Sequence, residues 1–112
     1  MPTQNQNYLV IPLPDNFDEN SLAQFSSELD QLLANEHIYF VFDLGRIDIL
    51  NSKLVSHFEN IYNRLLAVEK KMAFVNAKEE IREILEFVGL SKIIETFDEE
   101  ATFVEAIERG EI

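Results

Sequence analysis

The sequence predicts an α/β domain built around a mainly parallel sheet of four or five strands, with about four helices. Short apolar runs typical of buried strands alternate four times with segments whose apolar residues recur at helical spacing. The connections are short, as expected for right-handed crossover units. Because 46% of the 112 residues are hydrophobic and nine are Phe, residues 1–112 can bury one core. No linker or internal repeat divides them.

The first strand and the first helix are expected in the N-terminal third. Residues 8–13 (YLVIPL) form an apolar run that Pro14 closes, whereas residues 1–7 are polar and expected to be loosely ordered. After the next turn, Asp18 or Asn20 is available to cap a helix. The apolar residues at helical spacing in this segment are Leu22, Phe25, Leu29, Leu32 and Leu33.

The second strand is predicted at residues 38–44 (IYFVFDL), which are almost continuously apolar and rich in aromatic and β-branched types. This pattern is typical of a strand buried on both faces of a parallel sheet. A second helix should begin near Asn51 or Ser52. Its predicted buried face consists of Leu54, Val55, Phe58, Ile61, Tyr62, Leu65 and Leu66.

A third strand and helix are predicted from residues 72–75 (MAFV) onward. Asn76, followed three residues later by Glu79, resembles a capping box and predicts the start of this helix. Gly89 stands where a left-handed C-terminal cap is expected. The predicted buried stripe consists of Ile81, Ile84, Leu85 and Val88.

The fourth strand is predicted at residues 93–97 (IIETF). Asp98 is expected to cap the last helix, and Gly110 is expected to end it. Val104 and Ile107 are the apolar residues assigned to its buried side.

Composition excludes several functions. Nine basic residues against 21 acidic ones give a formal charge of −12, which disfavours nucleic acid and anionic lipid surfaces. The absence of cysteine excludes disulfides and thiolate metal sites, and two histidines are too few for a histidine-rich metal cluster. Neither a signal peptide nor an apolar run of roughly 18 residues is present. We therefore expect a cytoplasmic protein with no membrane insertion, no metal and no cofactor.

No arrangement of residues indicates an enzyme. Asp43 ends a strand, as the phospho-accepting aspartate of receiver domains does, but the acidic pair and the lysine that such a site needs are missing, so Asp43 is expected to position the next turn. Neither His37 nor His57 has a nucleophile or carboxylate at a spacing that would indicate a catalytic pair. Lys78, Arg82 and four glutamates of the third helix indicate a solvated face with local ion pairs. The four glutamates are Glu79, Glu80, Glu83 and Glu86.

Several short motifs follow one another in the order found in a known family. Phe42-Asp43-Leu44 ends a buried strand, residues 51–54 (NSKL) begin a helix, Val75-Asn76 ends the next strand, and residues 85–90 (LEFVGL) end the next helix. Phe17-Asp18 stands where an L-D pair closes an earlier turn. With these motifs the chain resembles the STAS domain of bacterial anti-sigma factor antagonists over most of its length.

The resemblance implies a regulatory domain that binds another protein, commonly a kinase-like anti-sigma factor, through a D-S-S-G loop at the start of a helix. In that family the kinase phosphorylates the second serine, and the phosphate, which adds roughly two negative charges, weakens the complex. By resemblance the partner-binding residues here are Asp18, Asn51, Ser52, Lys53 and Leu54. The place of the second serine is occupied by Lys53, so Ser52 is the candidate phosphoacceptor.

Three interpretations of the N-S-K-L loop remain open. Asn51 or Ser52 caps the helix and Lys53 is solvated; or Ser52 accepts a phosphate that Lys53 helps to hold; or the domain is a permanently non-phosphorylated form that always binds. The loss of the second serine also motivates a second hypothesis for the function. In that hypothesis, the chain is a STAS-like accessory subunit of an ABC-type lipid transporter that packs on the ATPase without switching.

Overall fold

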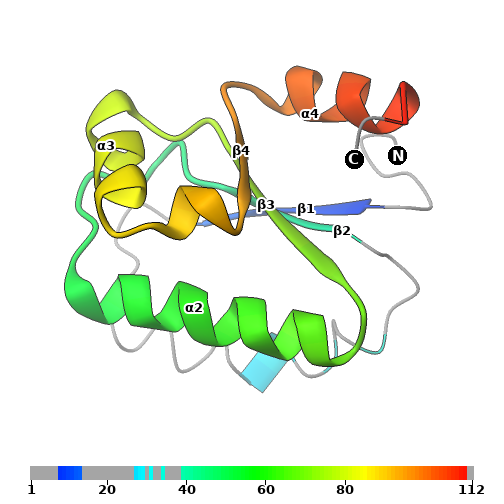
Figure 1. The fold of residues 1–112 in the computed structure, drawn as a ribbon, viewed down its shortest axis with the longest axis horizontal. Coiled ribbons are helices and arrows are strands. Elements are labelled where there is room, and N and C mark those ends of the chain that lie inside the picture. Colours follow the sequence, from blue (N-terminus) through cyan, green and yellow to red (C-terminus); the bar gives the residue numbers. More distant parts are fainter. Residues whose placement is uncertain (1–7, 14–26, 30, 32–33, 35–38, 111–112) are drawn as a thin grey trace.

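The computed structural model describes residues 8–13, 27–29, 31, 34 and 39–110, and its strands form one parallel sheet in the order β1-β2-β3-β4 (Figure 1). This confirms the predicted α/β class. Residues 1–7 and Asp18 lie outside the described residues, so neither the expected looseness of the former nor the role of the latter is tested. The strands are β1 (Tyr8–Pro12), β2 (Tyr39–Asp43), β3 (Lys71–Val75) and β4 (Glu95–Phe97).

The central strand β2 explains why its sequence is so uniformly apolar. Val41 pairs with Val10 of β1 on one side and with Ala73 of β3 on the other. Four of the five β2 residues are buried, and only Asp43 at the end is partly exposed. A strand flanked by two others and covered on both faces has no solvent-facing side, so it does not alternate between apolar and polar residues.

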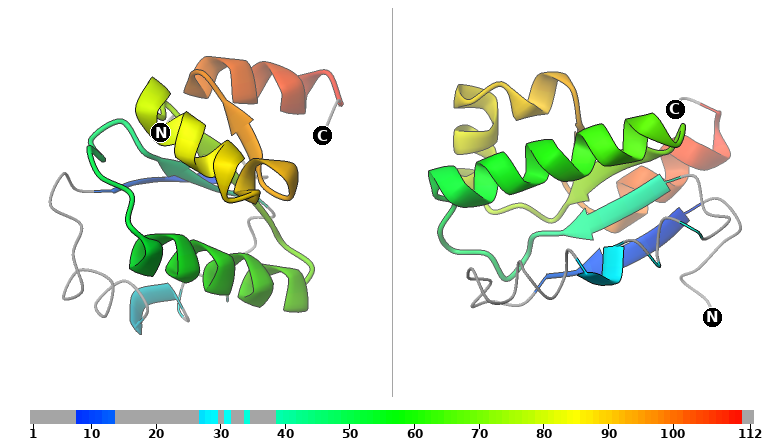
Figure 2. Two further views of the ribbon diagram at one scale, coloured as in Figure 1. Left: turned by 60° about the vertical axis from the view of Figure 1, so that its left-hand side comes forward. Right: turned by 90° about the horizontal axis from the view of Figure 1, so that it is seen from below.

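Helices cover both faces of the sheet, as Figures 1 and 2 show. The helices α2 (Ser52–Ala67) and α3 (Glu79–Phe87) pack in the core on one face, while α4 (Glu100–Glu108) packs on the other. A single 3-10 turn, η1 (Leu90–Lys92), leads from α3 toward β4. Of the first predicted helix, residues 27–29 and 31 are described; they are helical, and Leu29 is fully buried.

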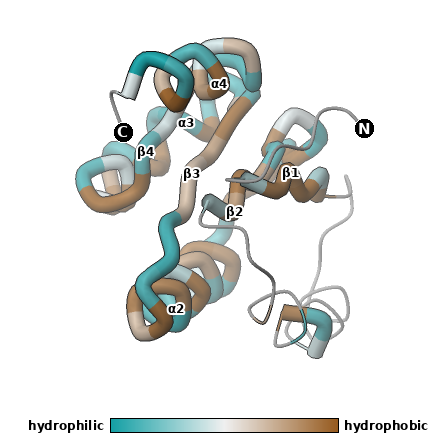
Figure 3. Tube along the Cα trace, turned by 90° about the vertical axis from the view of Figure 1, so that its right-hand side faces the viewer, coloured by the Kyte–Doolittle hydropathy of each residue, from teal (hydrophilic) through white to brown (hydrophobic). Residues whose placement is uncertain are grey.

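One phenylalanine organises the core on the α2 side. Phe58 of α2 is fully buried and makes edge-to-face contacts with Phe42 of β2 and Phe74 of β3, at ring-centroid distances of 6.4 and 5.0 Å. Hydrophobic residues accordingly mark the strands in Figure 3. These contacts tie α2 to two neighbouring strands at once.

The opposite core is centred on Phe103 of α4. Its ring lies edge-on to those of Tyr8, Tyr39 and Phe97, with centroid distances between 5.3 and 5.5 Å. Because these three residues belong to β1, β2 and β4, a single side chain of α4 connects three strands of the sheet. The buried side predicted for this helix was wrong by one position. Phe103 and Ala106 are buried, whereas the predicted Val104 and Ile107 are only partly buried.

The capping box predicted for α3 is wrong. Asn76 lies in the left-handed region, with a φ of 61°, and turns the chain as it leaves β3. Helix α3 begins only at Glu79, and its N-cap is Lys78, which makes no side-chain capping bond. Asn tolerates the left-handed region better than most residues, which explains its place in this turn.

The cap predicted for α4 is also wrong. The N-cap residue is Glu99, with no side-chain capping bond, and Asp98 forms an ion pair with Arg82 of α3. The Asp98 carboxylate, which the local pattern assigned to the start of α4, therefore binds a side chain of another helix instead. The glycine predictions are confirmed: Gly89 and Gly110 follow their helices with φ values of 86° and 74°.

Candidate functional site at the start of α2

The sequence-predicted loop lies where the carboxyl ends of the parallel strands meet. After β2 the chain turns sharply, and the Gly45 N–H donates to Oδ1 of Asp43 at 2.9 Å. A Cβ atom on Gly45 would lie 3.1 Å from that same oxygen, so a glycine suits this close approach. The prediction that Asp43 positions the turn is confirmed.

The segment between this turn and α2 is anchored by a buried residue at every third position. Leu44, Ile47 and Leu50 are buried, and the Leu44 N–H donates to the carbonyl of Val75 at the end of β3. Ile49 points away from this core and is 75% exposed. An exposed apolar side chain on an ordered segment is available as an anchor for a partner.

A charged contact adds a second anchor. Asp48 forms an ion pair with Lys78, the residue before α3, and so joins the segment to the start of the next helix. The ion pairs that the sequence assigned locally to α3 are thus made with residues outside that helix, namely Asp48 and Asp98. No group of three or more His, Cys, Asp or Glu in the described part of the chain could hold a metal ion.

The first turn of α2 begins with a complete N-cap. The Leu54 N–H donates to Oδ1 of Asn51 at 2.9 Å, while the Asn51 carbonyl accepts the N–H of Val55. Ser52 and Lys53 are exposed, and Leu54 turns inward with 4% exposure. Leu54 therefore anchors the turn from below, while the three preceding side chains face the solvent.

The electrostatics of this turn favour an anion. The N-terminal end of a helix carries a partial positive charge, and the first turn of α2 contains Lys53 and no acidic residue. The N–H groups of Ser52 and Lys53 precede the point at which intrahelical bonding begins. A phosphate on Ser52 would thus lie beside helix N–H groups and a lysine, a combination that binds phosphate elsewhere.

Two features of this site were not predicted. Ile49 was not singled out, because a run of three apolar residues in four (Ile47, Ile49 and Leu50) does not reveal which one faces the solvent. The ion pair between Asp48 and Lys78 joins residues 30 apart in the sequence, and no local signal indicates it.

His57 lies one and a half turns farther along α2 and is half-buried. Burial lowers the pKa of its imidazole below the usual 6.5, and the nearby positive charge of Arg64 lowers the pKa further. The neutral imidazole is therefore favoured in the folded protein.

Three comparisons place the chain among known proteins. A family model described as STAS domain matches residues 1–103. No match was found among curated protein sequences.

In the described part of the chain, no helix is long and apolar enough to span a membrane.

Solved structures share the fold. The unphosphorylated anti-sigma factor antagonist SpoIIAA aligns with a TM-score of 0.74 and 19% identity, covering 95% of this chain and 91% of that one. The phosphorylated SpoIIAA, a Bacillus cell fate determinant, gives 0.68 and 21%, covering 94% and 92%. The protein TM1081, solved by NMR, gives 0.77 and 17%, covering 90% and 79%.

The family match extends over nearly the whole chain, and the parallel sheet with helices on both faces agrees with it. This chain belongs to the STAS domain family.

Proposed function

We propose that residues 1–112 form a single regulatory domain that acts in the cytoplasm by binding a kinase-like anti-sigma factor at the start of α2. The observation that supports this most strongly is the exposed trio Asn51, Ser52 and Lys53 beside the exposed apolar side chain of Ile49. Such a surface offers a partner one apolar side chain with polar neighbours in the sequence, the combination of apolar centre and polar rim found at protein interfaces. Membership of the STAS family supports a regulatory, non-enzymatic role.

The segment before α2 also suits binding because it is already ordered. Leu44, Ile47 and Leu50 fix it in the core, and the Asp48 carboxylate ties it to Lys78. A partner that binds such a segment does not have to order it, so less free energy is lost on association. By resemblance, Asp18 would contribute to the same surface.

Ser52 is the proposed phosphoacceptor. Its side chain is exposed at the first helical position, next to Lys53, and no acidic residue shares that turn. A phosphate there would be held by the helix end and would also place roughly two negative charges beside Ile49, where a partner desolvates the surface. Phosphorylation should therefore weaken the complex.

Calorimetric titration against a candidate kinase-like anti-sigma factor tests the binding surface. Ile49→Asp should raise Kd by at least about tenfold, since it places a charge at the apolar anchor. Val68→Asp makes a similar change at a half-exposed residue just past the other end of α2 and should leave Kd unchanged. Equal affinities for wild type and Ile49→Asp would contradict the proposal.

Phosphorylation is tested separately. After incubation with the kinase and ATP, phosphopeptide mass spectrometry should detect a modified Ser52, and the signal should disappear in Ser52→Ala. The phosphorylated protein should bind the partner more weakly than the unmodified one. An unmodified Ser52 together with tight binding would instead support a domain that is always able to bind.

The second candidate function is that of a static accessory subunit of an ABC-type lipid transporter. Lys53 favours it, because this residue occupies the place of the serine that the resemblance expects to be phosphorylated and is exposed there. Affinity purification from the native cell distinguishes the two functions. Recovery of a transporter ATPase without any kinase-like protein, and with Ser52 unmodified, would favour the subunit.

A further inference from the structure

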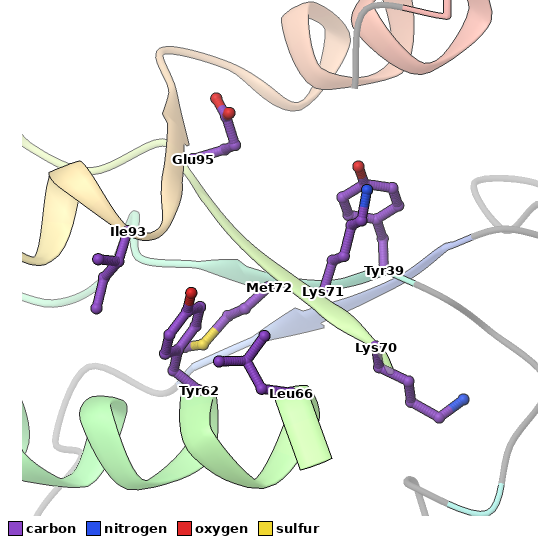
Figure 4. Close-up of a pocket in the computed structure, with 8 residues that line it drawn as sticks. All are labelled: Tyr39, Tyr62, Leu66, Lys70, Lys71, Met72, Ile93 and Glu95. Atoms are coloured by element: carbon purple, nitrogen blue, oxygen red, sulfur yellow. The ribbon is translucent and has the colours of Figure 1, made fainter. Parts of the chain in front are cut away.

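A cavity opens at the other end of α2, where the sheet has an uneven edge. Strand β4 pairs with Ala73–Val75 of β3, so Lys71 and Met72 extend beyond the start of β4. The last turns of α2 pass beside this overhang, and a cavity of about 320 Å³ lies between them and β4. We call this cavity the edge groove; Figure 4 shows its lining.

One part of the edge groove is apolar. Met72 is buried at its floor, and Tyr62, Leu66 and Ile93 surround the same space (Figure 4). Leu66 and Ile93 are 51% and 49% exposed although both are aliphatic. The groove thus offers apolar surface to a ligand at a place where the domain itself does not cover it.

Another part is cationic. The Lys71 ammonium lies 5.4 Å from the ring centroid of Tyr39, which also lines the groove. The Lys70 ammonium lies 5.6 Å from the ring centroid of Phe40, and its side chain points away from Lys71 (Figure 4). The chain between α2 and β3 is visibly hydrophilic in Figure 3. In a protein with nine basic and 21 acidic residues, Lys71 gives this part of the groove a local positive charge.

Glu95 limits the charge that the groove accepts. Its carboxylate group belongs to the lining on the β4 side (Figure 4). A ligand with one anionic group at Lys71 offers no second negative charge to Glu95, whereas a ligand with several negative charges would be repelled.

We propose that the edge groove binds a small soluble amphiphile with one anionic head and a short apolar chain. Lys71 attracts the head, and Met72, Leu66 and Ile93, on the other side of β3, accept the chain around the exposed end of that strand. The volume is at the small end of ligand pockets, which suits one short chain. A free molecule is preferred over a membrane lipid, because a net charge of −12 is repelled by an anionic bilayer.

This site is independent of the proposed partner surface. Helix α2 has 16 residues and is about 24 Å long at the usual rise per residue, and the two sites lie at its opposite ends. Binding in the edge groove can therefore be present or absent whatever the start of α2 binds.

The test is a titration of the ¹⁵N-labelled protein followed by NMR amide shifts, with three probes. Octanoate carries both chain and charge, octan-1-ol only the chain, and acetate only the charge. Octanoate should bind saturably and shift amides of residues 62–72 and 93–95, more tightly than octan-1-ol and with acetate inactive. Lys71→Gln should raise the octanoate Kd about two- to fivefold, as expected for a solvent-exposed charge.

Two variants complete the test. Leu66→Glu, at a half-exposed helical position that tolerates the change, should abolish saturable octanoate binding. Lys53→Gln is the matched control, since it removes the same charge at the far end of α2 and should leave Kd unchanged. The proposal is overturned if acetate alone reproduces the shifts, if octan-1-ol binds as tightly as octanoate, or if Lys53→Gln weakens binding as much as Lys71→Gln.

Discussion

Asn51 combines two properties at one residue: its side chain closes the first turn of α2, and its exposed position places it in the proposed partner surface. These contributions can be separated by substitution, because the cap depends on a side-chain oxygen and not on the exposed amide nitrogen.

We expect Asn51→Ala to lower the free energy of unfolding by about 1 kcal/mol, because the Leu54 N–H loses its acceptor. Asn51→Asp keeps an oxygen there and should remain within about 0.5 kcal/mol of wild type. Urea unfolding followed by circular dichroism measures both. If Asn51→Ala is as stable as wild type, the side chain is not acting as a cap.

A residue-scale effect of pH should come from His57. Because burial lowers its folded-state pKa, the unfolded chain binds the proton more readily. The stability associated with the neutral imidazole is complete above the unfolded pKa of about 6.5 and is lost as the pH falls through that value toward the folded pKa. Stability should therefore decline on mild acidification.

Urea unfolding of wild type and His57→Gln at several pH values between about 7.5 and 5.5 measures this effect. Wild type should lose more stability than the variant over that range, since carboxylate titration is common to both proteins. Parallel profiles would show that His57 is not the group responsible.

At the residue scale the sequence predicted the start of α2 correctly and the starts of α3 and α4 incorrectly. Asn51 caps its own helix through a hydrogen bond to a residue only three positions away, and a local pattern can reveal such a contact. Asn76 lies in a left-handed turn, and Asp98 pairs with Arg82, 16 residues away. Neither the backbone turn at Asn76 nor the distant partner of Asp98 is part of the local capping pattern.

At the scale of elements, helical periodicity predicted the buried centres of α2 and α3 better than their ends. Phe58, Ile61 and Leu65 are buried as expected, but Leu66 is half-exposed. The reason is the late start of β4, which leaves the last turn of α2 without a strand beside it and creates the edge groove. The continuous apolar pattern of β2 predicted burial on both faces, because every position of that strand has a neighbour.

A buried and an exposed phenylalanine should differ strongly in their contribution to stability. Phe103→Ala should lower the free energy of unfolding by about 3–5 kcal/mol, because it leaves a cavity among aromatic rings of three strands. Phe87→Ala, at a side chain that is 91% exposed, should change it by less than about 0.5 kcal/mol. Guanidinium unfolding curves of the two variants provide the measurement. Similar losses in both would contradict the described core.

The whole molecule is strongly acidic, and its charges repel one another more in the compact state than in the unfolded chain. Added salt screens this repulsion. At physiological ionic strength, exposed charges more than about 8–10 Å apart interact only weakly. The acidic excess was visible in the composition, but the long-range ion pairs of Lys78 and Arg82, which relieve it locally, were not.

We expect Tm to rise as sodium chloride is increased from about 0.01 to about 0.15 M. The double variant Glu83→Gln and Glu86→Gln removes two exposed negative charges from α3 and should show a smaller rise. Differential scanning calorimetry of both proteins at matched pH measures the slopes. A Tm of wild type that is insensitive to salt would mean that charge repulsion does not limit stability.

The spatial order of the strands is identical to their order along the chain. During synthesis on the ribosome, each new strand therefore finds its neighbour already made, and no strand has to be inserted between two earlier ones. Once residue 75 has emerged, β1, β2, β3 and α2 can assemble, and β4 with α4 only extends the growing edge. A nascent chain of this topology can become compact progressively from its N-terminus.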